Sequence, residues 1–277
     1  MAGLSARHLQ AIHTLLRNRG DTVPLNATWQ QIQRVLEVGE PRGKTLYFDA
    51  DMLRVLRTEA SRAAGSDLLA NVPGGDRLHT ARSGFIDEKL APQRPDAGYV
   101  LVKGALPAPL PQLAPELSLR VPLSSLELTA IEQVLVIENL DCFDNCHQYR
   151  LPEAAGRSLV VYRGHDAQAK GMLQLLSSLP PTTPIVCFPD YDPAGLGIAL
   201  ALPRCDALLV PELTPALLAK GSRDDFLEQY RSIRHLEGRE LDGWQAVWEE
   251  MLGQQLSIKQ QHMLALEAPL RLLPRRS

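Results

Sequence analysis

Three carboxylates in the second half of the chain have the residue types and positions of a catalytic or metal-binding cluster. Glu138 follows the apolar run 134–137, and Asp190 and Asp192 follow an apolar run that ends at Phe188. Both runs are short and aliphatic, which is typical of buried parallel strands. Ligand sites of open α/β sheets lie outside the carboxyl ends of the strands, so we expect the three carboxylates to meet in one crevice.

The chemistry expected of such a cluster is the binding of a divalent cation. Unpaired carboxylates about 4 Å apart repel one another by roughly 4 kcal/mol per pair at an effective dielectric constant of about 20. A cation removes this repulsion, and a set of oxygen ligands favours Mg²⁺ or Mn²⁺ over zinc. The sequence therefore predicts that Glu138, Asp190 and Asp192 hold Mg²⁺ or Mn²⁺ at a site suited to phosphate chemistry.

The elements that must position these residues alternate between strands and helices. A second apolar run at 159–162 and a helical pattern at 166–179 lie between the two carboxylate-bearing strands. Pro193 begins a further helix, whose free N–H groups would favour a bound anion. Arg163 and Lys170, which follow the second apolar run, are candidate phosphate contacts. The order of elements predicts an open α/β sheet.

Composition bounds the class of protein. With 277 residues and 45% hydrophobic residues the chain can bury one large or two ordinary cores. No apolar run has the length of a membrane span, and the amino-terminal segment lacks the apolar core of a signal peptide, so we expect a cytoplasmic protein without a membrane segment. Four cysteines in a chain of this length do not form a disulfide framework.

The amino-terminal part has the order of elements of a winged-helix-like module. Helical patterns at 5–19 and 28–39 precede a short apolar strand at 45–48 and a helix that Asp49 caps. Residues 1–104 carry 14 Lys/Arg against 11 Asp/Glu, whereas the remainder carries 15 against 21. A mildly basic module of this kind suits DNA binding, although a solvated face is an equally simple interpretation. The candidate DNA contacts are Arg54, Arg57, Arg77 and Arg82.

Proline content predicts the domain boundary. Five prolines between 105 and 122 interrupt any regular element, as expected of a semi-rigid spacer. The sequence thus predicts a DNA-binding domain at 1–104, a linker at 105–122 and a catalytic domain at 123–277 with helices at its carboxyl end.

The carboxylate pattern resembles that of a known domain family. A Glu after the first strand (Glu138), a Gly after the second (Gly164) and Asp190-Tyr-Asp-Pro-Ala-Gly195 after the third resemble the Toprim domain of topoisomerases, primases and nucleases, over about residues 130–215. Behind a winged-helix-like module, this form is most similar to the A-subunit branch of topoisomerase VI. Within that branch it is closest to the Wadjet and MksG nucleases of SMC-like plasmid-defence complexes.

The resemblance implies both a fold and a function. The fold would be a Toprim-like open, mainly parallel sheet with flanking helices, preceded by a winged-helix-like α+β domain. The function would be Mg²⁺- or Mn²⁺-dependent hydrolysis of phosphodiester bonds in double-stranded plasmid DNA, with the three carboxylates as catalytic metal ligands. A homodimer and SMC- or condensin-like partners are also implied. The family's acidic motif near the carboxyl terminus is absent from 258–262, which leaves only Gln261 and Glu267 as candidates for a second metal site.

Other interpretations stay open at this point. A topoisomerase VI-like transesterase would need a tyrosine nucleophile, for which the first 104 residues offer only Tyr47 and Tyr99. A Toprim-like module without activity could serve as a docking subunit, and Asp-x-Asp phosphotransferases or glycosyltransferases also use metal-bound carboxylates. A zinc site at Cys142, Cys146 and His147 has no second ligand pair at the usual spacing.

Overall fold

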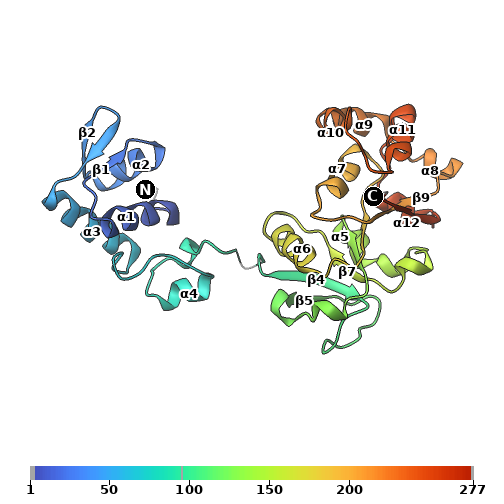
Figure 1. Ribbon diagram of the computed structural model, residues 1–277, viewed down its shortest axis with the longest axis horizontal. Coiled ribbons are helices and arrows are strands. Elements are labelled where there is room, and N and C mark those ends of the chain that lie inside the picture. Colours follow the sequence, from blue (N-terminus) through green and yellow to red (C-terminus); the bar gives the residue numbers. More distant parts are fainter. Residues whose placement is uncertain (1–3, 95, 276–277) are drawn as a thin grey trace. The chain divides into compact units, whose positions relative to one another are not determined.

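The computed structural model describes residues 4–94 and 96–275, with no side-chain description at 166 and 167. The chain forms two compact units, residues 1–95 and 96–277 (Figure 1). Each unit has its own hydrophobic core.

The first unit combines helices with a small antiparallel sheet whose strand order is β1-β3-β2. Helices α1 and α3 contact each other, and α1 also contacts α2. The amphipathic stripes expected from the sequence face this core, where Leu9, Ile12 and Ile32 are fully buried. The elements are α1 (Ala6–Arg17), β1 (Thr22–Pro24), α2 (Ala27–Leu36), β2 (Glu40–Arg42), β3 (Thr45–Tyr47), α3 (Ala50–Ala64) and α4 (Arg77–Arg82).

Helix caps fix the boundaries in this unit. Asp49 caps α3 as expected, because its side chain accepts a hydrogen bond from the N–H of Met52. The helical pattern expected from Thr28 begins one residue earlier, at Ala27, because Asn26 is the cap and its side chain accepts a hydrogen bond from the N–H of Trp29. Gly65 ends α3 at a φ of 77°, a conformation that favours glycine.

The second unit is a mixed α/β domain around a seven-stranded sheet of order β10-β9-β8-β6-β7-β4-β5. The four strands β9, β8, β6 and β7 are parallel. Strands β10, β4 and β5 add to the edges in antiparallel orientation, so the expectation of a mainly parallel sheet holds for the centre alone. The strands are β4 (Tyr99–Gly104), β5 (Leu119–Pro122), β6 (Val134–Ile137), β7 (Leu159–Tyr162), β8 (Ile185–Phe188), β9 (Ala207–Pro211) and β10 (Leu270–Pro274).

The structure places the domain boundary earlier than the sequence predicted. The first unit ends at residue 95, and β4, expected in the first domain, pairs with β7 of the second sheet. The expected linker at 105–122 belongs to the second unit, since it contains β5 and its Leu106 is buried in the core of that unit. The prolines do not separate domains here, because the leucines between them provide apolar surface that the core buries.

Helices surround the sheet of the second unit, and α7 contacts both α10 and α11 (Figure 1). Trp244 and Trp248 are buried in the core of this unit. The helices are α5 (Leu140–Asp144), α6 (Asp166–Ser178), α7 (Pro193–Ala201), α8 (Pro215–Leu218), α9 (Arg223–Glu228), α10 (Tyr230–Leu236), α11 (Gln245–Gln254) and α12 (Gln260–Ala265).

None of the helices within residues 4–94 and 96–275 is both long enough and apolar enough to span a membrane.

Candidate functional site

The candidate site lies where the strand order of the second sheet reverses. Strands β6 and β8 are neighbours, but β6 leads on to β7 on one side and β8 leads on to β9 on the other. Ile137 pairs with Phe188, and the N–H of Glu138 donates to the carbonyl oxygen of Phe188 over 3.3 Å. Crevices at such reversals are the usual binding sites of open α/β sheets. The sheet therefore brings Glu138 and Asp190 together, as the sequence predicted.

Glu138 is a largely buried carboxylate with a raised pKa. Its side chain is 19% exposed, and its Oε2 accepts a hydrogen bond from the N–H of Asp190 over 3.2 Å. Burial raises the pKa of Glu138 to about 6, and the charge of Asp190 adds to this effect. A carboxyl in this environment gains from a nearby cation, because a positive charge favours its ionised form.

Asp190 is held from both sides of its carboxylate. Oδ1 accepts a hydrogen bond from the backbone N–H of Gln260 over 2.8 Å, and Oδ2 lies 3.6 Å from Nζ of Lys259. Burial and the neighbouring Asp192 raise the pKa of Asp190, against the opposing effect of these two contacts. Within the described segments, Oδ2 of Asp190 therefore has only the long contact with Lys259.

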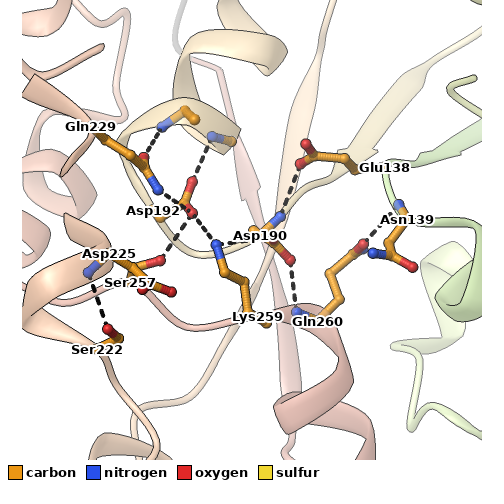
Figure 2. Close-up of polar contacts among 12 residues, drawn as sticks. Glu138, Asn139, Asp190, Asp192, Ser222, Asp225, Gln229, Ser257, Lys259 and Gln260 are labelled. Atoms are coloured by element: carbon orange, nitrogen blue, oxygen red, sulfur yellow. Dashed lines mark hydrogen bonds and ion pairs between the residues drawn. The ribbon is translucent and has the colours of Figure 1, made fainter. Parts of the chain in front are cut away.

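Asp192 lies deeper than the other two carboxylates, with a side chain that is 3% exposed. It is the N-cap of α7, and its Oδ1 accepts from the N–H of Gly195 over 2.8 Å. Its Oδ2 accepts from Gln229, Ser257 and Lys259 over 2.8, 3.0 and 3.1 Å (Figure 2). With three donors, Oδ2 is saturated, whereas Oδ1 keeps one lone pair in a side chain that solvent hardly reaches.

The amino terminus of α7 is closed by protein groups. The N–H of Ala194 donates to Oε1 of Gln229, and the N–H of Gly195 is taken by Asp192. Pro193 has no N–H to offer. The expected binding of an anion at this helix terminus is therefore not supported. Gly195 has a packing role instead, because a Cβ there would lie 2.2 Å from the carbonyl oxygen of Asp190.

A segment near the carboxyl terminus completes the site. Ile258 forms an antiparallel bridge with Tyr191, and Gln260 donates through Nε2 to the carbonyl oxygen of Phe188. Oε1 of Gln260 accepts from the N–H of Asn139, which follows β6 directly (Figure 2). From the sequence, this stretch was notable only because it lacks the expected carboxylates, and Lys259 was not predicted as a site residue. The positive charge of Lys259 is the feature that could have indicated a role beside the acids.

Arg163, one of the two basic residues predicted near the site, lies beside Glu138. Its Nη2 lies 3.9 Å from Oε1 of Glu138, and its Nε is buried and has no hydrogen-bond partner among the described residues. Lys170 lies on α6 and is exposed, and the structure shows no contact between it and the carboxylates. Gly164, with a φ of 72°, forms the turn that follows Arg163.

The candidate DNA contacts lie in the first unit. Arg54 and Arg57, on α3, form ion pairs with Asp51 and Asp67 at 3.0 and 2.6 Å. Arg77 and Arg82, on α4, are exposed and make no ion pair with any residue of the described segments. All four lie outside the unit that contains the carboxylates.

The tyrosines considered as nucleophiles are covered by arginines. The guanidinium of Arg42 lies 3.7 Å from the ring centre of Tyr47, and that of Arg120 lies 3.8 Å from the ring centre of Tyr99. Tyr47 is half-buried, not the core residue that its apolar strand suggested.

The arrangement of the side chains bears on each of the expected metal sites. Within the described segments, no three or more His, Cys, Asp or Glu side chains are arranged to hold a metal ion. Cys142 and Cys146 are buried free thiols whereas His147 is exposed, so these three do not form a zinc site. Oxygens of Glu138 and Asp190 suit one hard cation, whereas both oxygens of Asp192 are already engaged.

Comparison with known proteins places the second unit in a family. No curated protein matches the chain. The model of the family described as Domain of unknown function (DUF7281) matches residues 94–272, which is more than half of the chain and includes all of the site residues. The chain belongs to this family, the domain of unknown function DUF7281.

Proposed function

We propose that this protein is a Toprim-like, metal-dependent endodeoxyribonuclease subunit that hydrolyses phosphodiester bonds. The observation that carries the proposal is the meeting of Glu138, Asp190 and Asp192 at the reversal point of the sheet, with Arg163 and Lys259 beside them. Carboxylates flanked by cationic side chains suit a phosphate substrate, because both a divalent cation and the phosphate oxygens find partners there.

The residues fit Mg²⁺ or Mn²⁺ held by Glu138 and Asp190. When bound, such an ion activates water and stabilises charge on the reacting oxygens. Glu138 is oriented by the N–H of Asp190, and Asp190 by the N–H of Gln260. Asp192 serves as a positioning residue in this arrangement, because it fixes α7 and the ammonium group of Lys259.

Arg163 is the side chain best suited to bind a phosphate oxygen. Its guanidinium is partly buried, reaches Glu138 only at 3.9 Å and leaves the Nε donor unused. A buried donor without an acceptor costs about 1–3 kcal/mol, so an anion that accepts from it binds favourably. Arg163 would thus orient the phosphodiester against the carboxylates.

The finer assignments rest on the resemblance to the Wadjet and MksG nucleases. On this proposal the first unit is a winged-helix-like module that binds double-stranded DNA, and the protein acts as a homodimer with SMC- or condensin-like partners. Dependence on a partner that recognises or bends the DNA limits cleavage by the isolated subunit. Robust digestion of any DNA by the purified chain would contradict that dependence, and a monomer in light scattering would contradict the homodimer.

Plasmid nicking and linearisation in Mg²⁺ or Mn²⁺ tests the proposal directly. Wild type is compared with Glu138→Ala and Asp190→Ala, with and without the candidate SMC-like subunits. Glu153→Ala, which removes an exposed carboxylate of the same unit, is the matched control. We expect cleavage by wild type and the control and its loss in both site variants. Equal cleavage by all four proteins would show that a contaminating nuclease is responsible.

A docking module is the second candidate, because Lys259 already neutralises much of the charge that a metal would neutralise. It predicts that DNA or partner binding persists while no preparation cleaves DNA under any condition. In that case the carboxylates and Lys259 form a structural ion-pair network.

A further inference from the structure

The side chain of Lys259 occupies a position among the carboxylates at which a second metal ion would otherwise neutralise charge. Its Nζ lies 3.1 Å from Oδ2 of Asp192 and 3.6 Å from Oδ2 of Asp190, so one ammonium group contacts both acids (Figure 2). We infer that Lys259 is the built-in second cation of this site and that the site takes one divalent cation, not two. The inference rests on the proposed metal-dependent function.

The backbone on both sides of Lys259 is fixed, so the ammonium group is not on a free tail. Ile258 and Tyr191 exchange backbone hydrogen bonds of 3.0 and 2.9 Å. On the other side, the N–H of Gln260 is bonded to Asp190 itself. The two anchors place the lysine next to the acids by the fold of the chain, which lowers the entropy lost on forming the ion pairs.

Oδ2 of Asp192 has no lone pair left for a metal, and Oδ1 belongs to a side chain that is only 3% exposed. Oδ1 accepts one hydrogen bond and Oδ2 accepts three, one of them from Lys259. A second divalent ion at Asp192 would have to displace the ammonium group of Lys259. The neutral donors Gly195, Gln229 and Ser257 would still occupy the oxygens of Asp192. Repulsion between the two cations opposes that displacement at close range.

The opposite side of the site has the free acceptors. Among the described residues, Glu138 Oε1 has only the distant contact with Arg163 at 3.9 Å, and Oδ2 of Asp190 has only the contact with Lys259 at 3.6 Å. One ion between these two carboxylates leaves Lys259 in place. The side chain of Lys259 is 36% exposed, so a phosphate oxygen bound at the ion can also reach the ammonium group. The lysine, with a charge of +1, then supplies part of the positive charge that a second divalent ion supplies in two-metal sites.

Titration of the metal-stripped full chain with Mn²⁺ tests this inference without any cleavage assay. Isothermal titration calorimetry gives the number of ions bound per chain, and electron paramagnetic resonance of free Mn²⁺ checks that number. We expect one ion in wild type. Lys259→Met should gain a second ion or bind the first at least about tenfold more tightly, because the uncompensated charge of Asp190 and Asp192 is then available. Lys259→Arg, which keeps the charge, should bind one ion as wild type does.

Several results would overturn the inference. Two ions or none bound to wild type would do so without any variant, and so would unchanged binding in Lys259→Met. If Lys259→Met does not fold, Lys259→Gln carries the same expectation, and circular dichroism identifies the folded variant. The outcome is separable from that of the proposed function. If wild type binds two ions and cleaves plasmid, only the proposed role of Lys259 is contradicted. If wild type binds one ion and cleaves plasmid under no condition, only the proposed nuclease function is contradicted.

Discussion

The backbone N–H of Gln260 donates a hydrogen bond to Oδ1 of Asp190 over 2.8 Å, and the two residues are 70 positions apart in the sequence. The same glutamine bonds through its side chain to the carbonyl oxygen of Phe188 and to the N–H of Asn139. It therefore joins the ends of the two strands that carry the site. The carboxyl-terminal segment is part of the site and not an appendage to it.

Replacing Gln260 should destabilise the second unit. Gln260→Ala leaves the N–H of Asn139 without its partner, and the carbonyl oxygen of Phe188 keeps only the 3.3 Å hydrogen bond from the N–H of Glu138. We expect the free energy of unfolding to fall by about 1–3 kcal/mol. Urea unfolding measures the loss. The neighbouring Gln261→Ala, which removes a half-buried side chain, should change stability by less than about 1 kcal/mol. Equal effects of the two substitutions would show that the bonds of Gln260 contribute little.

Removal of the Asp192 carboxylate should cost more than the loss of an ordinary helix cap. Asp192→Ala deprives four donors of their acceptor, one of them the ammonium group of Lys259. Thr214→Ala is the control, since Thr214 caps α8 in the same unit by one bond of 3.2 Å to the N–H of Leu217. We expect Thr214→Ala to lower the free energy of unfolding by about 1 kcal/mol and Asp192→Ala to lower it by about 3–5 kcal/mol, as measured by urea unfolding. A similar loss in both variants would reduce Asp192 to a simple cap.

Stability without metal should depend on pH through Glu138. Its pKa is raised from 4.5 to about 6, so the folded state binds the proton more tightly than the unfolded state. The contribution of Glu138 to stability is therefore greatest below pH 4.5, falls as the pH rises through 6, and is lower by about 2 kcal/mol above that range. Glu138→Gln removes this dependence.

The measurement for Glu138 is urea unfolding in a chelating buffer at several pH values. The stability of Glu138→Gln relative to wild type should rise by about 2 kcal/mol between pH 4 and pH 7.5. Taking this difference between the two proteins cancels the titrating groups that do not interact with Glu138. A difference that does not change with pH would show that Glu138 has no raised pKa in the folded protein.

DNA binding by the first unit should depend on the arginines that make no ion pair. Arg77→Ala combined with Arg82→Ala should weaken binding of a short duplex and reduce the slope of log affinity against log salt by about 2 if both contact phosphates. Arg54 and Arg57 already have carboxylate partners, so their double alanine variant should have a smaller effect. Fluorescence anisotropy at several salt concentrations measures the affinity and the salt dependence of both double variants. An unchanged slope in the Arg77 and Arg82 variant would remove α4 from the DNA interface.

The sequence by itself determined the central strands and the placement of the carboxylates. The runs at 134–137 and 159–162 are strands at the predicted bounds, because continuous apolar residues of this length are stable only when both faces are buried. Glu138 and Asp190 meet because parallel neighbours end at the same edge of a sheet. Both statements follow from local pattern and from the geometry of parallel sheets.

Only the tertiary structure decided which residues surround these carboxylates and how their charge is balanced. Lys259, Gln260 and Gln229 reach the site from segments that no local pattern connects to β8, and their positions follow from long-range pairing such as that of Ile258 with Tyr191. The edge strands β4 and β10 were missed for the same reason, since antiparallel addition to an edge depends on what the rest of the fold leaves exposed. Periodicity records which face of a segment is buried, whereas partners distant in sequence are selected by packing and by the hydrogen bonds that buried polar groups require.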